Sequence, residues 1–263
     1  MFHLSRLSFI VTAMVLCSCV SAGSSEIARG TVFHDKNQNG SFDRGEKTLR
    51  GVGISNGVDI VETDSQGHYE ISIEENSFVF VIKPSGWRTA QRATKIPEFY
   101  YTHKPDGSPE LNDAFAKVAP TGKLPSSIDF PLYKQDEPDT FKLILFGDTQ
   151  PRTQQEVDFI AHDVVEELIG FEASFGMTLG DVVFDDLSLL VPLEQLVSTI
   201  GVPWYNVHGN HDINVSATNN EDSDETWESL YGPTYYSFDY AQVHFVVLDD
   251  IMWEGNRKFH GEL

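Results

Sequence analysis

The sequence predicts a layered α+β protein, in which a small β-sandwich precedes a partial α/β-β sandwich domain. Short alternating or apolar runs, separated by turn residues, occupy the chain from Ile27 to about Tyr133. Strand-like and helix-like runs alternate after that point, as in α/β domains. The 263 residues, of which 40% are hydrophobic, are enough for one large domain or two ordinary ones.

The first 22 residues have the pattern of an export signal. Arg6 precedes an apolar run from Leu7 to Leu16, and small residues precede Gly23 at the spacing of a cleavage site. The run is shorter than the ~20 residues of a membrane-spanning helix, which makes an anchor helix the weaker interpretation. "LCSC" also resembles a bacterial lipoprotein processing box, with Cys19 as the lipidation candidate. We expect a protein exported to the periplasm, outer envelope or extracellular space, with membrane contact only through the signal or a lipid anchor.

The charge balance bears on the partners that the protein can bind. There are 40 acidic residues against 18 basic ones, a formal net charge of −22. Such a surface repels nucleic-acid backbones, so no nucleic-acid scaffold is expected. Bound cations could still bring a phosphorylated substrate to an acidic protein. Because both cysteines lie within the export signal, we expect no disulfide in the mature chain.

Residues 23–135 are predicted to form the β-sandwich domain. Runs such as "HYEISI" alternate in polarity, and turns such as "SNG" and "DSQG" separate them. The charged, proline-containing segment 133–139 is the expected linker. The second domain is therefore assigned to residues 136–263.

A calcium-type loop lies near the start of the β-sandwich. The segment "DKNQNGSFDRGE", residues 35–46, fits the pattern D-x-[DN]-x-[DN]-G-x5-E without a gap. Calcium takes six to eight oxygen ligands, which this set supplies through side chains, a backbone carbonyl and water. Strand-like flanks exclude a helix-loop-helix sensor, and a chance polar turn is the alternative. The expected ligand positions are Asp35, Asn37, Asn39, Ser41, Asp43 and Glu46.

The second domain begins with three predicted strands separated by two helices. A continuous apolar run ends at "GDTQ", residues 147–150, and typifies a strand covered on both faces. Residues 153–170 have helical spacing, and Gly170 is the expected stop. A second helix is predicted around Pro192, which starts or kinks it. Two strands around residues 235–250 follow, and the acidic segment 219–225 is predicted to be a solvated loop.

Polar clusters follow the ends of all three strands. "GDTQ" follows the first, Gly180 and Asp181 the second, and "HGNHD", residues 208–212, the third. In open α/β sheets, ligands bind beyond the carboxyl ends of the strands, so these clusters should converge on one crevice. Each cluster alone resembles an ordinary turn or cap, whereas the three together indicate a site.

The order GD-x-Q, GD and GNHD resembles the calcineurin-like metallophosphoesterase superfamily over residues 141–263. The segment "GPTYYSFDYAQVHFVVLDD" is similar to the family's continuation, and the β domain matches one bacterial branch. The resemblance implies hydrolysis of phosphoesters at two divalent metals, by attack of hydroxide on phosphorus.

The resemblance also implies roles for particular residues. Asp148 and Gln150 would hold one cation, Asn210 the other, and Asp181 would bridge both. His211 would act as the acid or transition-state stabiliser, with Asp212 orienting its ring. His208 stands where the family often has proline, and is interpreted as a strand-end side chain.

Two departures from the family pattern modify this expectation. Gln150 stands where most members have histidine, and its harder oxygen shifts preference toward Mn or Mg and away from Zn, with Mn favoured and Fe possible in such sites. Past Asp250 the family's further histidine and Gly-His-x-His turn are not found, although "HGEL" is similar to the start of a helix that precedes them. We therefore expect a C-terminally truncated catalytic domain with weak or no activity.

Two functions remain from the sequence. One is an exported metal-dependent phosphoester hydrolase, an enzyme by lineage, with calcium in its N-terminal loop. The other is a non-catalytic calcium-binding envelope module with a vestigial phosphoesterase half. The sequence does not distinguish monoesters from diesters.

Overall fold

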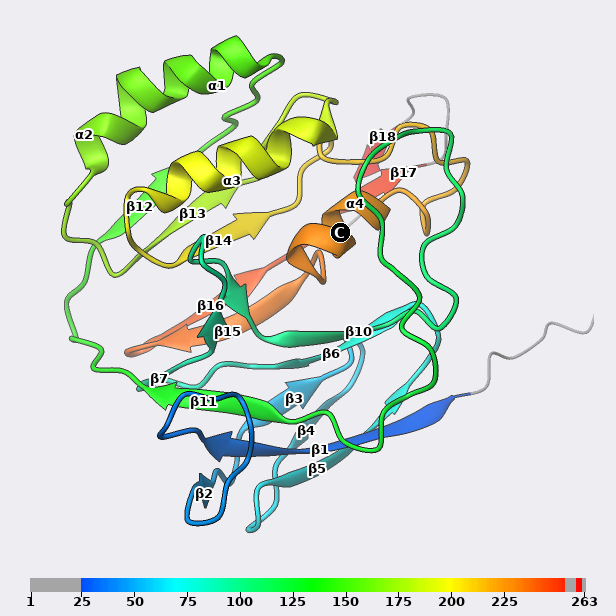
Figure 1. Cartoon of the computed structure of the whole chain (residues 1–263), viewed down its shortest axis with the longest axis vertical. Coiled ribbons are helices and arrows are strands. Elements are labelled where there is room, and N and C mark those ends of the chain that lie inside the picture. The colour runs from blue at the N-terminus through cyan, green and yellow to red at the C-terminus, as the bar shows by residue number, and fades with distance from the viewer. Residues whose placement is uncertain (1–24, 254–258, 262–263) are drawn as a thin grey trace, which may run out of the picture.

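The computed structural model describes residues 25–253 and 259–261, and its N-terminal part is built from two facing β-sheets (Figure 1). In strands such as β5, inward Tyr69, Ile71 and Ile73 alternate with outward polar residues, so one face is buried. One sheet contains β2 (Lys47–Thr48), β1 (Glu26–His34), β11 (Phe130–Lys134) and β7 (Trp87–Arg88), and β5 (His68–Ile73) pairs with β1. The other contains β10 (Tyr100–His103), β6 (Ser77–Val81), β3 (Gly53–Ser55) and β4 (Ile60–Glu62), and β8 (Ala90–Gln91) pairs with β9 (Pro97–Glu98).

A parallel sheet and its helices form the opposite side of the molecule (Figure 1). The sheet has the order β12 (Leu143–Phe146), β13 (Phe175–Leu179) and β14 (Trp204–Val207). Thr153 caps the first helical segment, and Pro192 lies in the first turn of α3, where its missing N–H is not needed. The helical segments are α1 (Gln154–Ile160), the π-helix η1 (Ala161–Val165), α2 (Glu166–Leu168), the 3-10 helix η2 (Leu187–Leu189) and α3 (Leu190–Ser198).

The remaining elements connect these two parts. A hairpin of β15 (Tyr236–Tyr240) and β16 (Val243–Val247) lies between the parallel sheet and the β-sandwich (Figure 1). Strand β17 (Ile251–Trp253) pairs with β18 (Phe259–Gly261), so the helix start expected at "HGEL" is wrong for residues that lie in β18. The solvated loop expected at residues 219–225 is also wrong in part, because its end is buried as the N-terminus of α4 (Glu225–Tyr231).

The predicted fold class, a layered α+β sandwich, is confirmed by this arrangement. One hydrophobic core nevertheless extends across both predicted domains. Phe80 and Leu132 of the sandwich belong to the same buried cluster as Phe175 of β13 and Phe238 of the hairpin. The sandwich therefore packs on the second part through apolar side chains, and the division at residue 136 stays a prediction.

The segment expected to be a linker, residues 133–139, contains a buried anchor. Glu137 forms an ion pair with Lys83 at 2.7 Å, with only 2% and 5% of the respective side chains exposed. Lys83 also donates to the carbonyl of Asp239, and Glu137 accepts the N–H groups of Gly86 and Ala241 at 2.8 and 2.7 Å. Burial opposes charge on Glu137, yet these donors hold its pKa below its usual range. The segment thus joins the sandwich to the β15–β16 hairpin.

Two expectations concern contact with a membrane. The export signal and the lipidation candidate Cys19 fall outside the described residues. Among the residues that are described, none belongs to a helix with the length and apolar character required to cross a bilayer.

Replacing Glu137 by Ala should lower the free energy of unfolding by about 3–5 kcal/mol, because it leaves the Lys83 ammonium buried without its counter-charge. Urea denaturation of the full chain measures this. Glu70→Ala is the matched control: it removes an ion pair with Arg29 whose side chains are 66% and 54% exposed, and should cost less than about 1 kcal/mol. Equal effects of the two substitutions would contradict the anchoring role.

Candidate functional site

The three predicted polar clusters lie at one edge of the parallel sheet. Phe146 pairs with Thr178, and Leu179 pairs with Val207, so the three strands run in the same direction and end side by side. Asp148, Asp181 and Asn210 come two or three residues after these ends. The parallel topology therefore brings together side chains that are more than sixty residues apart in the sequence.

The backbone of these loops is in an uncommon conformation. Asp148, Gln150, Asp181 and Asp185 have φ angles of 45°, 40°, 45° and 61°. Non-glycine residues seldom adopt this left-handed region, and each such residue costs on the order of 1–3 kcal/mol. Strained residues gather at functional sites, where the surrounding structure holds them in place.

Asp181 is the residue on which the three loops meet. Its carboxylate accepts the side-chain amide of Gln150 at 2.5 Å and the backbone N–H of His211 at 3.1 Å. Its carbonyl accepts the N–H of Gln150 at 3.1 Å. A Cβ atom at Gly209 would lie 2.0 Å from the nitrogen of Asp181, so only glycine permits this approach. The predicted bridging carboxylate is thus at the centre of the cluster.

The donor set of this cluster suits hard divalent cations. Asp148 is exposed, and Gln150, Asp181 and Asn210 are half-buried, which leaves their oxygen atoms accessible. Two carboxylates and two amides offer only oxygen ligands, which Mn and Mg accept readily. Gln150 here directs its amide nitrogen to Asp181, so its oxygen would face a cation after a half-turn of the amide. The residues present fit a divalent metal on these grounds.

Asp185, which the sequence pattern did not indicate, orients the ring of His211. We expected Asp212 to orient it, but the ring Nδ1 lies 2.8 Å from an oxygen of Asp185. Phe184 stacks on the same ring, with centroids 4.1 Å apart. The spacing of Asp185 from Asp181 contains no signal for this contact, because it depends on how the loop after β13 packs against the loop after β14.

The Asp212 side chain instead joins the loop after β13 to the loop after β14 through hydrogen bonds. Its carboxylate accepts the N–H groups of Val182, Val183 and Gly209 at 3.0, 2.9 and 3.0 Å, and the residue is fully buried. A side chain directed toward these groups cannot also reach the ring of the neighbouring residue, which corrects its predicted role. Burial raises the pKa of Asp212 to about 6, against the opposing effects of His208 and of the backbone donors.

The calcium-type loop connects β1 to β2, in agreement with its strand-like flanks. Asp35 is buried and accepts the N–H groups of Gln38 and Gly40, both at 2.7 Å, and Gly40 makes the turn with a φ of 77°. Glu46 closes the loop by accepting the N–H groups of Lys36 and Asp43 at 2.8 and 3.0 Å.

The middle of that loop turns its polar side chains toward one another. The amides of Asn37 and Asn39 both donate to Asp43 at 2.8 Å, and these bonds lower the pKa of Asp43. Ser41 donates its N–H to the oxygen of Asn39 at 2.9 Å. The first, third, fifth, ninth and twelfth positions of the motif are therefore gathered in one small loop.

Replacing Asp212 by Asn should lower the free energy of unfolding by about 1–3 kcal/mol, because the amide NH2 cannot accept a hydrogen bond and at least one of the three buried N–H groups loses its acceptor. Chemical denaturation measures the change. Asp163→Asn, on the exposed face of η1, is the control and should stay within about 0.5 kcal/mol of the parent. A stable Asp212→Asn variant would show that the carboxylate does not hold the loops.

Comparison with known proteins supports the family resemblance. Residues 36–117 match the family described as the N-terminal of calcineurin-like phosphoesterase. No curated protein matches the chain. Among solved structures, it is similar to a purple acid phosphatase from yellow lupin (Lupinus luteus) seeds, with 13% identity and a TM-score of 0.28. That match covers 85% of this chain and 44% of the phosphatase chain, so the present chain spans less than half of its length. Residues 36–117 are therefore similar to the N-terminal domain of calcineurin-like phosphoesterases, in agreement with the resemblance of the sequence to that superfamily.

Proposed function

We propose that this chain is an exported, metal-dependent phosphoester hydrolase. The observation that carries the proposal is the meeting of Gln150, Asp181 and His211 at the aligned ends of three parallel strands. The superfamily acts on phosphoesters through divalent metals, which fits the oxygen-rich cluster.

In this proposal Asp181 would be the ligand shared by two cations, Mn being favoured. Asp148 and Gln150 would hold one cation, and Asn210 would hold the other. Two cations, when bound, would supply the attacking hydroxide and neutralise the charge that develops on the phosphoryl oxygens. Their mutual repulsion requires an anionic ligand between them, a role that suits the carboxylate at the centre of the cluster.

The protein's own contribution to the reaction is positioning and proton transfer. Asp185 on Nδ1 and Phe184 on the ring face fix His211, so Nε2 is the nitrogen that would face a phosphoryl oxygen or the leaving group. The guanidinium of Arg152 lies 3.9 Å from the centre of the Phe184 ring and holds it from the other side. The loops around this histidine are thus arranged to keep one ring nitrogen available.

Hydrolysis tests the proposal. We expect the full chain with Mn²⁺ to cleave bis-p-nitrophenyl phosphate or p-nitrophenyl phosphate slowly, and His211→Ala to lower kcat by about 10²–10⁴-fold without changing Mn²⁺ affinity. Asp181→Ala should lower Mn²⁺ affinity, measured by calorimetry, and abolish hydrolysis, because it removes the shared ligand.

Glu62→Gln, on the exposed surface of β4, is the control and should change neither quantity. If the parent hydrolyses neither ester and Asp181→Ala binds Mn²⁺ as tightly as the parent, the non-catalytic envelope module becomes the better account.

Export and attachment to the envelope are part of the proposal and rest on the N-terminal sequence. We place the mature protein in the periplasm, outer envelope or extracellular space, with Cys19 as the candidate for a lipid anchor. Recovery of the protein from the cytosolic fraction of producing cells would contradict this placement.

Calcium binding at residues 35–46 is a further part of the proposal. Asp35, Asp43 and Glu46 provide carboxylates, and Asn37, Asn39 and the carbonyl of Ser41 provide neutral oxygens. The existing hydrogen bonds already gather these groups, which limits the ordering that an ion would have to impose. The ion would rigidify the connection between β1 and β2 and take no part in the reaction.

Calcium at about 100 times its Kd should stabilise the full chain by about 2.7 kcal/mol, and Glu46→Gln should remove most of this effect. Thermal denaturation with calcium, magnesium or chelator measures it, and Glu62→Gln is again the control. A melting temperature that calcium does not change would leave the loop as an ordinary polar turn.

A further inference from the structure

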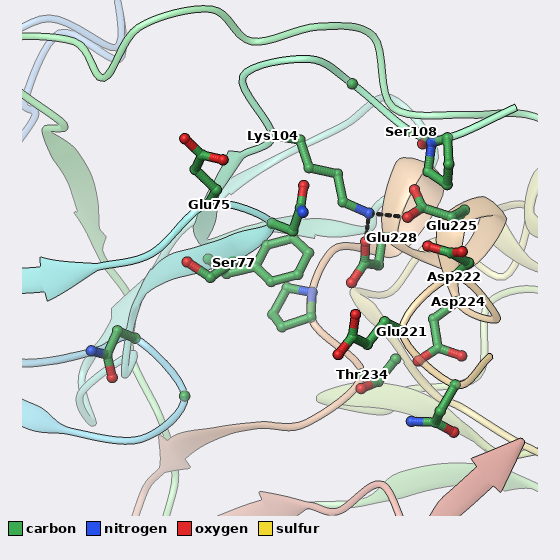
Figure 2. A pocket seen from close by; sticks show the side chains of 18 of the residues that line it. Glu75, Ser77, Lys104, Ser108, Glu221, Asp222, Asp224, Glu225, Glu228 and Thr234 are labelled. Atoms are coloured by element: carbon green, nitrogen blue, oxygen red, sulfur yellow. Dashed lines mark hydrogen bonds and ion pairs between the residues drawn. The ribbon is translucent and has the colours of Figure 1, made fainter. Parts of the chain in front are cut away.

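A cavity of about 760 Å³ lies between the β-sandwich and α4 (Figure 2). Eight of its lining residues are acidic, among them Asp222 and Asp224 before α4, Glu225 at its start and Asp249 two residues after β16. Lys104, from the loop after β10, is the one basic side chain among the described residues that line it. Such a cavity attracts cations.

Lys104 compensates only part of this charge. Its ammonium contacts Glu225 and Glu228 at 2.5 Å each, and its side chain is 3% exposed. Figure 2 shows this amine directed at those two carboxylates, whereas Asp224 lies apart from it. The carboxylates of Asp224 and Asp249 must therefore find positive charge elsewhere.

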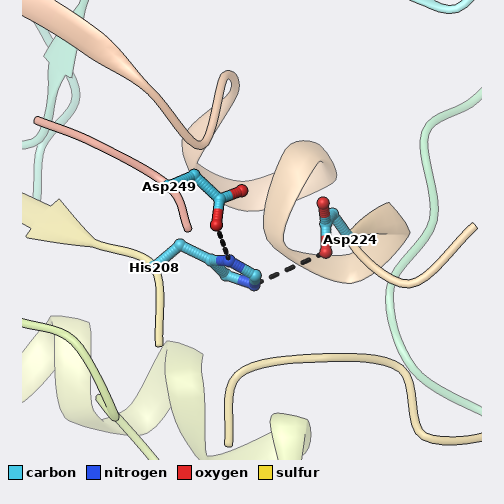
Figure 3. Close-up of side chains that lie close together, drawn as sticks. All are labelled: His208, Asp224 and Asp249. Atoms are coloured by element: carbon cyan, nitrogen blue, oxygen red, sulfur yellow. Dashed lines mark ion pairs between the residues drawn. The ribbon is translucent and has the colours of Figure 1, made fainter. Parts of the chain in front are cut away.

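Both of those carboxylates face the ring of His208 (Figure 3). Nε2 lies 3.6 Å from Asp224, Nδ1 lies 3.6 Å from Asp249, and the histidine side chain is fully buried. Within the described part of the chain, no partner lies within hydrogen-bond distance of either ring nitrogen. These separations exceed the 2.7–3.2 Å of an N–H···O bond, and a buried polar group without a bond is costly.

The two aspartates face different ring nitrogens, so a shared cation would bind one nitrogen and draw the more distant carboxylate toward it. Two ligand atoms about 2.1 Å from a metal, at a tetrahedral angle, lie roughly 3.4 Å apart. One ring nitrogen of His208 and one oxygen from each aspartate all lie within 4.8 Å of one another. A divalent cation would neutralise the two carboxylates and coordinate the imidazole in one step.

Neighbouring contacts already hold the three side chains in place. Trp227 lies edge-on to the His208 ring at 5.0 Å, which restricts its rotation. Asp224 accepts the hydroxyl of Ser223 at 2.9 Å, and Asp249 accepts the N–H of Ile251 at 2.9 Å. The strand end, the helix start and the hairpin end thus converge on one point beside the cavity.

We propose that His208, Asp224 and Asp249 form a separate site for a divalent transition-metal ion at the wall of this cavity. The imidazole favours Mn, Fe, Co or Zn over Ca or Mg. Asp224 and Asp249 line the cavity, so a cation held there would be reachable by water or a small anionic ligand from it. The site shares no ligand with the proposed catalytic cluster, so it does not depend on the proposed function.

The competing arrangement is a protonated His208 with no metal. Burial disfavours its charge, but Asp224 and Asp249 outweigh this and raise the pKa of His208 to about 9. A proton and a cation compete for the same nitrogen, and the experiment must distinguish them directly.

Pulsed EPR on the Mn²⁺-loaded full chain makes that distinction. The ligands proposed for the catalytic cluster and the calcium loop are all oxygen atoms, so ¹⁴N coupling from a coordinated imidazole reports the new site. We expect this coupling in the parent and in Asp181→Ala and Glu46→Gln, and its loss in His208→Gln. Asp224→Asn and Asp249→Asn should each lower Mn²⁺ affinity at this site at least tenfold.

Circular dichroism without metal checks that each variant folds. If His208→Gln does not fold, the loss of Mn²⁺ affinity in Asp224→Asn is the test of the site. Absence of imidazole coupling in the folded parent would overturn the proposal and favour the protonated pair. Coupling that persists in His208→Gln would overturn it as well, by assigning the signal to another histidine. Loss of hydrolysis in Asp181→Ala with retained coupling would separate this site from the proposed catalytic one.

Discussion

The arrangement of the molecule depends on a charge pair buried where the sandwich meets the hairpin. Lys83 and Glu137 cannot be buried singly, because an isolated ion in a protein interior costs several kcal/mol. Together they also engage the backbone of Gly86, Asp239 and Ala241, so the pair specifies how the two parts sit on each other. The apolar core that crosses the same boundary supplies most of the attraction. The acidic cavity beside α4 exists because this placement brings the loop after β10 opposite that helix.

A second constraint operates at the end of the parallel sheet. Four residues hold left-handed backbone angles there, each at a cost on the order of 1–3 kcal/mol. The three N–H groups bound by buried Asp212 and the close approach of Gly209 to Asp181 offset part of that cost. Stability is thus lowered locally in order to direct polar side chains toward one place.

The candidate site shows which residues a sequence can identify. Asp148, Asp181 and Asn210 were predictable because each follows an apolar run that must be a strand, and parallel strands end together. Asp185 was not predictable, since its contact with His211 joins two loops that are far apart in the sequence. The role expected for Asp212 was wrong for a related reason: neighbours in the sequence point in different directions, and backbone donors captured this carboxylate. His208, interpreted as a strand-end side chain, lies between two aspartates from segments far along the chain.

The sequence by itself determined the strand-rich first part, the alternation of strands and helices that follows it, the polar clusters at the strand ends and the calcium-type loop pattern, but not helix α4 or strand β18. These features depend on local periodicity and turn chemistry, which are encoded in neighbouring residues. Only the tertiary structure decided that the segment 133–139 anchors the sandwich to the β15–β16 hairpin and is not a free linker. It also decided that the acidic run before α4 is partly buried, and which carboxylate contacts His208 and His211. Those outcomes depend on burial, since a charged group placed in the interior must find its partner wherever the chain has brought one.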